Sequence, residues 1–203
     1  MSPESVRLGV VLTCSKQRRN LGRVRLFPGV HRLTLTTHAD RRGTLTEVYR
    51  EDWCPEVPGR QVNVMYSHAG VLRGVHVHRR HTDYFIVVAG RGLVGMHDAR
   101  LASPTFGQSL LLELGPDAPA ALVVPPGVVH GVFFPVDSLL VTVESETYDA
   151  EEEVRCRWSD PALGIHWPSA EACTSDADAA APSYSEMMER LVRFQPAFVI
   201  APA

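Results

Sequence analysis

Regularly spaced histidines are the residues of this chain best suited to chemistry. His76 and His78 are one residue apart, so an extended strand places both imidazoles on the same face. Asp83 follows at the start of the apolar run 84–88, which predicts a buried strand. His130 comes three residues after the last residue of a Pro-Pro-Gly turn, Gly127. Three imidazoles and a carboxylate are a typical ligand set for a divalent transition ion, with Fe(II) favoured and Mn, Ni or Zn also suitable.

The spacing of these four residues resembles the paired motifs of metal-binding cupin barrels. The first motif is His-x-His, four residues, an acid, six residues and Gly, and the second is Pro-x-Gly-x-x-His. The chain departs from the pattern in that the acid is Asp83 rather than Glu, and Phe134 stands where those barrels have Asn. The resemblance implies an all-β fold, a double-stranded β-helix or jelly-roll barrel, with a metal bound by His76, His78, Asp83 and His130.

Composition fits a single globular domain: the chain has 203 residues, of which 45% are hydrophobic and 21% charged. A net charge of −3 argues against nucleic acid as a partner, because binding to phosphates needs a concentrated basic face. Four irregularly spaced cysteines are expected to be reduced thiols, and no apolar run is long enough to cross a membrane. We therefore expect a cytoplasmic protein with no membrane partner.

Short strands are predicted from residue 31 onward, at intervals of roughly eight to twelve residues. The predicted strands are 31–35, 43–49, 61–66, 70–78, 84–88, 93–97, 110–114, 121–124, 131–134 and 139–144. Ser183 and Glu186 then form a capping box before one short amphipathic C-terminal helix. This pattern divides the chain into an N-terminal arm (1–30), a barrel (31–182), and a C-terminal helix and tail (183–203).

A longer resemblance runs from Asp40 to Pro182. There the chain is similar to the dTDP-4-dehydrorhamnose 3,5-epimerases, dimeric cupins that act on nucleotide-linked 4-keto-6-deoxy sugars. The segments that carry it are 40–43, 70–76, 103–107, 125–131, 160–161, 167–168 and 178–182. The resemblance implies a sugar nucleotide or related small-molecule substrate and a homodimer.

Site residues follow from this resemblance residue by residue. His76 falls on the family's catalytic base, and Asp178 falls on the acid that orients it. Such a carboxylate fixes the tautomer of the imidazole, which then removes a proton alpha to a ketone. The residues that fall on substrate-binding positions are Arg42, Glu47, Gln61, Asn63, Arg73, His130 and Glu153, to which we add Thr142 and Tyr148.

The chain differs from the epimerases at three positions of the site. His78 replaces a glutamine, Asp83 replaces the lysine that stabilises the enolate, and Thr142 replaces the catalytic tyrosine. An anion cannot stabilise an enolate, and a threonine hydroxyl is too weak an acid to reprotonate one. Lys16 is the only lysine of the chain, so a divalent ion is expected to act as the Lewis acid instead. We assign Tyr148 to the core rather than to acid catalysis.

The main hypothesis is therefore a metal-dependent cupin enzyme on an epimerase-like scaffold. It would isomerise a keto sugar, sugar nucleotide or nucleoside-like molecule by enolisation, or would be an iron-dependent oxygenase. The alternative is a metal-free 3- or 3,5-epimerase of a dTDP-4-keto-6-deoxyhexose, or a 3,4-ketoisomerase, because 73–78 also resembles ketoisomerases in which two histidines shuttle protons. A silent cupin that only binds a sugar or another protein is disfavoured by the retained His76 and Asp178.

Overall fold

The structure, a computed structural model, describes residues 22–194, and strands are the main regular secondary structure of this part of the chain. They are β1 (Arg23–Arg25), β2 (His31–Thr34), β3 (Thr37–Asp40), β4 (Gly43–Thr46), β5 (Gln61–Ser67), β6 (Leu72–His78), β7 (Asp83–Ala89), β8 (Gly92–Asp98), β9 (Ser109–Leu114), β10 (Ala120–Val124), β11 (Val128–Phe133), β12 (Ser138–Glu144) and β13 (Glu153–Arg155). The helices are α1 (Asp176–Ala179) and α2 (Tyr184–Phe194), with short 3₁₀ turns at Glu51–Trp53 and Pro161–Leu163. None of these described helices is long and apolar enough to cross a membrane.

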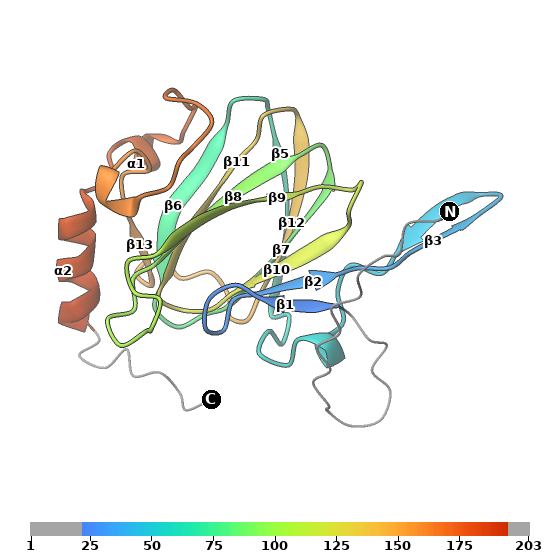
Figure 1. Ribbon diagram of the computed structural model, residues 1–203, viewed down its shortest axis with the longest axis horizontal. Coiled ribbons are helices and arrows are strands. Elements are labelled where there is room, and N and C mark those ends of the chain that lie inside the picture. Colours follow the sequence, from blue (N-terminus) through green and yellow to red (C-terminus); the bar gives the residue numbers. More distant parts are fainter. Residues whose placement is uncertain (1–21, 195–203) are drawn as a thin grey trace, which may run out of the picture.

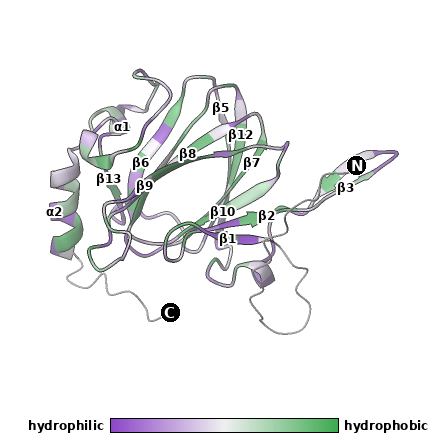
Figure 2. Ribbon diagram, in the orientation of Figure 1, coloured by the Kyte–Doolittle hydropathy of each residue, from purple (hydrophilic) through white to green (hydrophobic). Residues whose placement is uncertain are grey.

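Two facing sheets form the barrel (Figure 1). The six-stranded sheet has the order β1-β2-β10-β7-β12-β5, and the five-stranded sheet has the order β13-β6-β11-β8-β9. Apolar side chains from both sheets, such as Phe85, Met96 and Leu122, fill the space between them, and β7 is hydrophobic along most of its length (Figure 2). The jelly-roll prediction is confirmed.

The pairing of β6 with β11 brings two histidine-bearing strands unusually close. A Cβ at Gly74 would lie 2.9 Å from the His130 carbonyl oxygen, and a Cβ at Gly131 would lie 2.9 Å from the Arg73 carbonyl oxygen. Gly74 also has a φ of +95°, which disfavours any residue with a Cβ. Both positions therefore require glycine, and they set the distance between the imidazoles on the two strands.

A C-terminal helix covers the outer face of the five-stranded sheet. Met187 and Leu191 of α2 are buried against Val75 and Val77 of β6, the residues that alternate with the two histidines. Hydrophobic and hydrophilic residues alternate around α2 (Figure 2), and the Glu186 carboxylate accepts a hydrogen bond from the Ser183 backbone N–H at 2.8 Å. The predicted amphipathic helix and its capping box are thus observed.

Part of the predicted arm belongs to a sheet. Residues 1–21 lie outside the described residues, but β1 pairs antiparallel with β2, and Phe27 and Val30 are buried in the core. The short strands β1, β3 and β13 were not predicted from the sequence. The predicted strand 131–134 in fact begins at Val128, so His130 lies within β11.

The hairpin β3–β4 extends away from the barrel (Figure 1). Its residues are almost entirely exposed, including Leu45 at 62%. Strand β5, at the edge of the six-stranded sheet, also presents apolar residues to solvent: Val62, Val64 and Tyr66 are 59%, 65% and 55% exposed. The described part of the chain thus has a protruding hairpin and, on the edge strand β5, an exposed apolar row.

Candidate active site

A cavity of about 180 Å³ lies between the two sheets. Residues of β6, β11 and β13 from the five-stranded sheet and of β5, β7 and β12 from the six-stranded sheet line it. Its polar lining residues are Asn63, Arg73, His76, His78, His81, Asp83, His130, Thr142, Glu144, Tyr148 and Glu153. The fold thus gathers in one place most of the residues singled out from the sequence.

Strands β6 and β11 supply three of the imidazoles. His76 and His130 are cross-strand partners, and His78 lies two residues beyond His76 on the same face. The ring centroid of His76 is 4.8 Å from that of His78 and 4.7 Å from that of His130. Their ligating nitrogens lie within 4.8 Å of one another. The expected convergence of the three histidines is therefore observed.

Asp83, at the start of β7, faces these histidines from the opposite sheet. Its Oδ2 lies 3.2 Å from His78 Nε2 and 3.1 Å from His130 Nε2. Burial alone would raise the pKa of Asp83, but the neighbouring imidazoles, His78 foremost, hold it well below its ordinary value. The carboxylate is therefore an anion enclosed by imidazoles.

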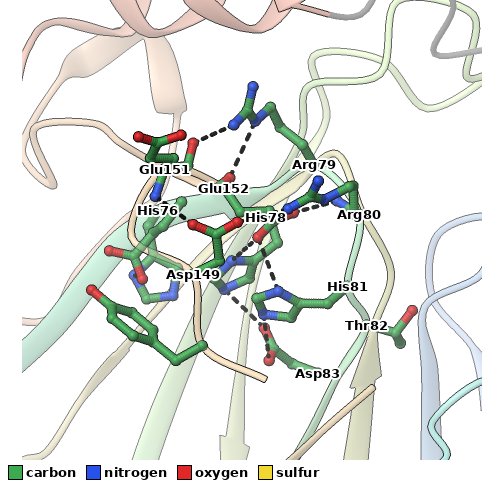
Figure 3. Close-up of polar contacts among 12 residues, drawn as sticks. His76, His78, Arg79, Arg80, His81, Thr82, Asp83, Asp149, Glu151 and Glu152 are labelled. Atoms are coloured by element: carbon green, nitrogen blue, oxygen red, sulfur yellow. Dashed lines mark hydrogen bonds and ion pairs between the residues drawn. The ribbon is translucent and has the colours of Figure 1, made fainter. Parts of the chain in front are cut away.

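A second histidine–carboxylate pair, which sequence analysis missed, adjoins the first. The rings of His78 and His81 lie 3.7 Å apart between the carboxylates of Asp83 and Glu152 (Figure 3). Glu152 Oε2 is 3.3 Å from His78 Nδ1 and 2.9 Å from His81 Nδ1. Glu152 is only 2% exposed, although it lies in the acidic run 149–153, whose composition is typical of a solvated turn. No local sequence signal distinguishes it from its exposed neighbours.

The imidazoles of the cluster have opposite electrostatic surroundings. Burial lowers the pKa of His76 well below 6.5, and the charges of His130 and His78 lower it further. For His78, burial is outweighed by Asp83 and Glu152, and the pKa rises to about 9. The same two carboxylates raise the pKa of His81 to about 10. At neutral pH His76 is an unprotonated imidazole, as a general base must be, beside cationic neighbours.

Asp178, which was predicted to orient His76, interacts with other residues instead. Asp178 lies 3.3 Å from Arg155 Nε and accepts a hydrogen bond from the Ser175 hydroxyl at 2.9 Å. Glu153 contributes the carboxylate that pairs with His76, because its Oε2 lies 3.8 Å from His76 Nδ1. Arg155 also pairs with Glu153 at 2.5 Å. The structure thus links His76 to Asp178 through Glu153 and Arg155.

The predicted substrate-binding residues divide into two groups. Asn63, Arg73, Thr142, Tyr148 and Glu153 line the cavity. Gln61 lies just behind it and accepts a hydrogen bond from the Tyr148 backbone N–H at 2.8 Å. Arg42 pairs with Asp40 at the exposed turn of the β3–β4 hairpin, and Glu47 pairs with Arg50. The assignment of Tyr148 to the core is wrong, because it is 60% exposed and lines the cavity.

Comparison with known proteins defines the class to which this fold and site belong. The family model described as dTDP-4-dehydrorhamnose 3,5-epimerase matches residues 25–186. The chain therefore belongs to the dTDP-4-dehydrorhamnose 3,5-epimerase family.

Individual relatives agree with the family match. The dTDP-4-dehydro-6-deoxyglucose 3-epimerase of a Streptomyces species is 33% identical over 72% of this chain and 80% of its own length. The dTDP-4-dehydrorhamnose 3,5-epimerase of Mycobacterium tuberculosis (strain CDC 1551 / Oshkosh) is 32% identical over 79% and 85%. The solved structure of Legionella pneumophila RmlC in complex with dTDP-4-keto-L-rhamnose has a TM-score of 0.78 and 25% identity, covering 85% of this chain and 97% of that chain.

The expectation of a metal-dependent enzyme or iron-dependent oxygenase is wrong. The relatives are named as sugar epimerases, and the family's reaction, as outlined from the sequence, uses a histidine base and a lysine rather than a metal. The enzyme class is therefore that of a sugar epimerase. The comparisons favour the metal-free alternative over the main hypothesis.

Proposed function

We propose that this protein isomerises a dTDP-4-keto-6-deoxyhexose without a metal, with His76 as the base that removes a proton alpha to the ketone. The observation that carries the proposal is the position of His76: it lies in a cavity that also gathers Asn63, Arg73 and Glu153. The relatives named above act, by their names, on sugars of this class. A cytoplasmic location stays a prediction.

Arg73 is suited to hold the anionic end of such a substrate. Its Nε donates to the Ser67 hydroxyl at 2.8 Å and its Nη2 donates to the Tyr66 carbonyl at 3.1 Å. These bonds fix the guanidinium at the cavity wall, where its planar fork recognises phosphate oxygens. On the opposite wall, the Asn63 amide donates to Glu144 Oε1 at 2.7 Å and offers further polar contacts for a sugar hydroxyl.

Two other residues take the roles of the missing lysine and tyrosine. His78, whose ring lies beside that of His76, supplies positive charge next to the enolate. Tyr148 returns the proton, because it is the one phenol among the described residues that line the cavity and a phenol is a far stronger acid than the Thr142 hydroxyl. These assignments give an epimerase with a retained base and a relocated acid.

A 3,4-ketoisomerase is the second candidate. His76 and His78 are on the same face of β6, and moving a ketone to the next carbon requires protons to be taken and returned along one face of the sugar. Both ring nitrogens of His78 already face carboxylates, which favours the epimerase.

We also propose a homodimer in which the β3–β4 hairpin reaches the second copy. Arg42 lies in the turn between β3 and β4 and its side chain is exposed, so it meets a substrate only if the hairpin of one copy lies over the pocket of the other. The apolar row Val62, Val64 and Tyr66 would then be covered. Light scattering should give the dimer mass for the wild type and the monomer mass for Val64→Glu; a monomeric wild type would contradict the dimer.

Incubation of the metal-stripped enzyme with dTDP-4-keto-6-deoxyglucose tests the proposed function. Proton NMR should show a new nucleotide sugar inverted at C3, at C5 or at both. A 3-keto product would instead select the second candidate. Unchanged substrate after prolonged incubation, with enzyme that is folded by circular dichroism, would contradict both.

A further inference from the structure

The enolate of the proposed reaction needs a hydrogen-bond donor at its oxygen, and three histidines of the cavity are already paired. Both ring nitrogens of His78 face carboxylates, Asp83 at 3.2 Å and Glu152 at 3.3 Å. His81 pairs with the same two groups, at 3.4 and 2.9 Å. One ring nitrogen of His130 lies 3.1 Å from Asp83, and the other lies 2.9 Å from a backbone carbonyl oxygen. The donor therefore has to come from another side chain that lines the cavity.

Glu144, the last residue of β12, lines the cavity from the six-stranded sheet. It lies two residues after Thr142, on the same face of the strand, and Thr142 stands where the epimerases have their catalytic tyrosine. Glu144 is also the cross-strand partner of Asp83 on β7 and of Gln61 on β5. It therefore approaches the cavity from the wall that faces His76.

A chain of hydrogen bonds fixes which oxygen of Glu144 accepts. The Tyr148 backbone N–H can only donate, and it bonds to Gln61 Oε1 at 2.8 Å. The Gln61 amide nitrogen therefore donates to Asn63 Oδ1 at 3.2 Å, and the Asn63 amide nitrogen donates to Glu144 Oε1 at 2.7 Å. The Thr142 hydroxyl lies 3.3 Å from the same oxygen. Among the residues that the structure describes, every hydrogen bond of this carboxyl group goes to Oε1, which leaves Oε2 for a proton and a substrate.

The surroundings of Glu144 favour a proton on this carboxyl group. Burial raises its pKa, and the negative charge of Asp83 raises it further. The cationic His81 and His78 and the Thr142 hydroxyl act in the opposite direction without cancelling the rise. A substrate that fills the cavity removes water and disfavours the anion more strongly. A neutral carboxylic acid can donate the hydrogen bond that a carboxylate cannot.

We propose that Glu144 is a catalytic residue that donates a hydrogen bond from Oε2 to the 4-keto oxygen of the substrate. This inference rests on the proposed function. A lysine would supply both a positive charge and a donor at the enolate; in this chain His78 supplies the charge and Glu144 supplies the donor.

The proton and electron movements balance without any other reactant. When His76 takes the proton from the carbon alpha to the ketone, the C–H electron pair forms the C=C bond of the enolate. The C=O π pair moves to the oxygen, which is stabilised by the hydrogen bond from Glu144. When Tyr148 returns a proton to the carbon, both electron pairs move back and the proton of Glu144 remains on Oε2.

Deuterium exchange by variants at this position tests the role. The chelator-treated full chain is incubated with dTDP-4-keto-6-deoxyglucose in heavy water, and NMR follows C3 and C5. Glu144→Ala removes the donor and should slow exchange about 10²–10³-fold. Glu144→Gln keeps an N–H donor and should lose about tenfold at most. The matched control Glu146→Gln removes an exposed partner of Arg60 outside the cavity, so it should exchange at the wild-type rate.

The pH dependence separates catalysis from a purely structural role. Wild-type exchange should fall as the pH rises through the pKa of Glu144, because the neutral acid is the active form. Glu144→Gln has no such group and should hold its rate until His78, whose pKa is about 9, loses its charge. The nucleotide dTDP carries no ketone, so its affinity, measured by calorimetry, should stay close to that of the wild type in each variant.

Exchange at the wild-type rate by Glu144→Ala that still binds dTDP would overturn the role of Glu144 and leave the proposed function intact. A pH profile of Glu144→Gln identical to that of the wild type would do the same. This second variant keeps the shape of the side chain and an acceptor for Asn63, so it decides the matter even if Glu144→Ala does not fold. Absence of exchange by the folded wild type would contradict the proposed function itself, and this assignment with it.

Discussion

The wall of the cavity formed by β6 and β11 carries His76 and Arg73, which match the epimerase family, whereas the wall formed by β7 and β12 carries Asp83 and Thr142, which do not. The side chains of the second wall are buried and have polar partners. Thr142 is 3% exposed and accepts a hydrogen bond from Asn63, and Asp83 is enclosed by imidazoles. The substitutions at Asp83 and Thr142 therefore do not leave a poorly packed or unpaired site. On the proposed function, one wall keeps the base His76, whereas the other carries the buried anion Asp83 where the family has a lysine.

Replacing His76 by Asn should have the largest effect, because it removes the base from the retained wall. We expect proton exchange at the carbon alpha to the ketone to fall about 10²–10⁴-fold, measured as deuterium incorporation in heavy water. Circular dichroism and thermal melting serve as controls for folding. Exchange at the wild-type rate would place the base on another residue.

Asp83→Asn tests the rebuilt wall through stability. It leaves the charges of His78 and His81 without one of their two carboxylates, and breaking such a buried pair costs about 3–5 kcal/mol. Urea denaturation of the metal-stripped protein measures the loss. The control Glu113→Gln removes an exposed partner of Arg91 and should cost at most about 1 kcal/mol. Equal stability of the two variants would show that Asp83 is not the organising anion.

Tyr148→Phe sharpens the comparison by separating the two half-reactions. If Tyr148 returns the proton, net inversion should fall about 100-fold, while deuterium exchange catalysed by His76 persists. NMR of the same sample measures both. An unchanged inversion rate would remove Tyr148 from the mechanism.

Thr142→Val should have the smallest effect. The hydroxyl is within 3.3 Å of Asn63 Nδ2 and Glu144 Oε1 and is too weak an acid for the reaction, so exchange and inversion should stay within about threefold of the wild type. A loss comparable with that of Tyr148→Phe would make Thr142 the proton donor.

The alternation of inward-facing and outward-facing side chains made the barrel strands and the His76–His78 pair predictable from the sequence. The predicted strand 61–66 corresponds to β5, and 93–97 corresponds to β8, because period-two patterns depend only on neighbouring residues. The three-residue strands β1 and β13 gave no such signal, since they are held by pairing with β2 and β6. The positions of β1 and β13 therefore depend on contacts with other strands, which a local sequence pattern does not reveal.

The site was predictable where its residues lie on regular strands. His76, His78 and His130 met as expected, whereas Glu152 and Tyr148 lie in an acidic connection whose composition is typical of a solvated turn. Glu152 is buried because the Arg80 backbone N–H and two imidazoles bind its carboxylate. Asp178 was expected beside His76, but Arg155, which pairs with it at 3.3 Å, lies on β13, a strand that the sequence did not predict.

Deuterium incorporation from heavy water tests the central claim most directly. The metal-stripped wild type is incubated with a dTDP-4-keto-6-deoxyhexose, and NMR follows C3 and C5. We predict that deuterium enters at one or both of these carbons and that His76→Asn slows its entry about 10²–10⁴-fold. Absence of deuterium at both carbons in folded, metal-stripped enzyme would contradict the account.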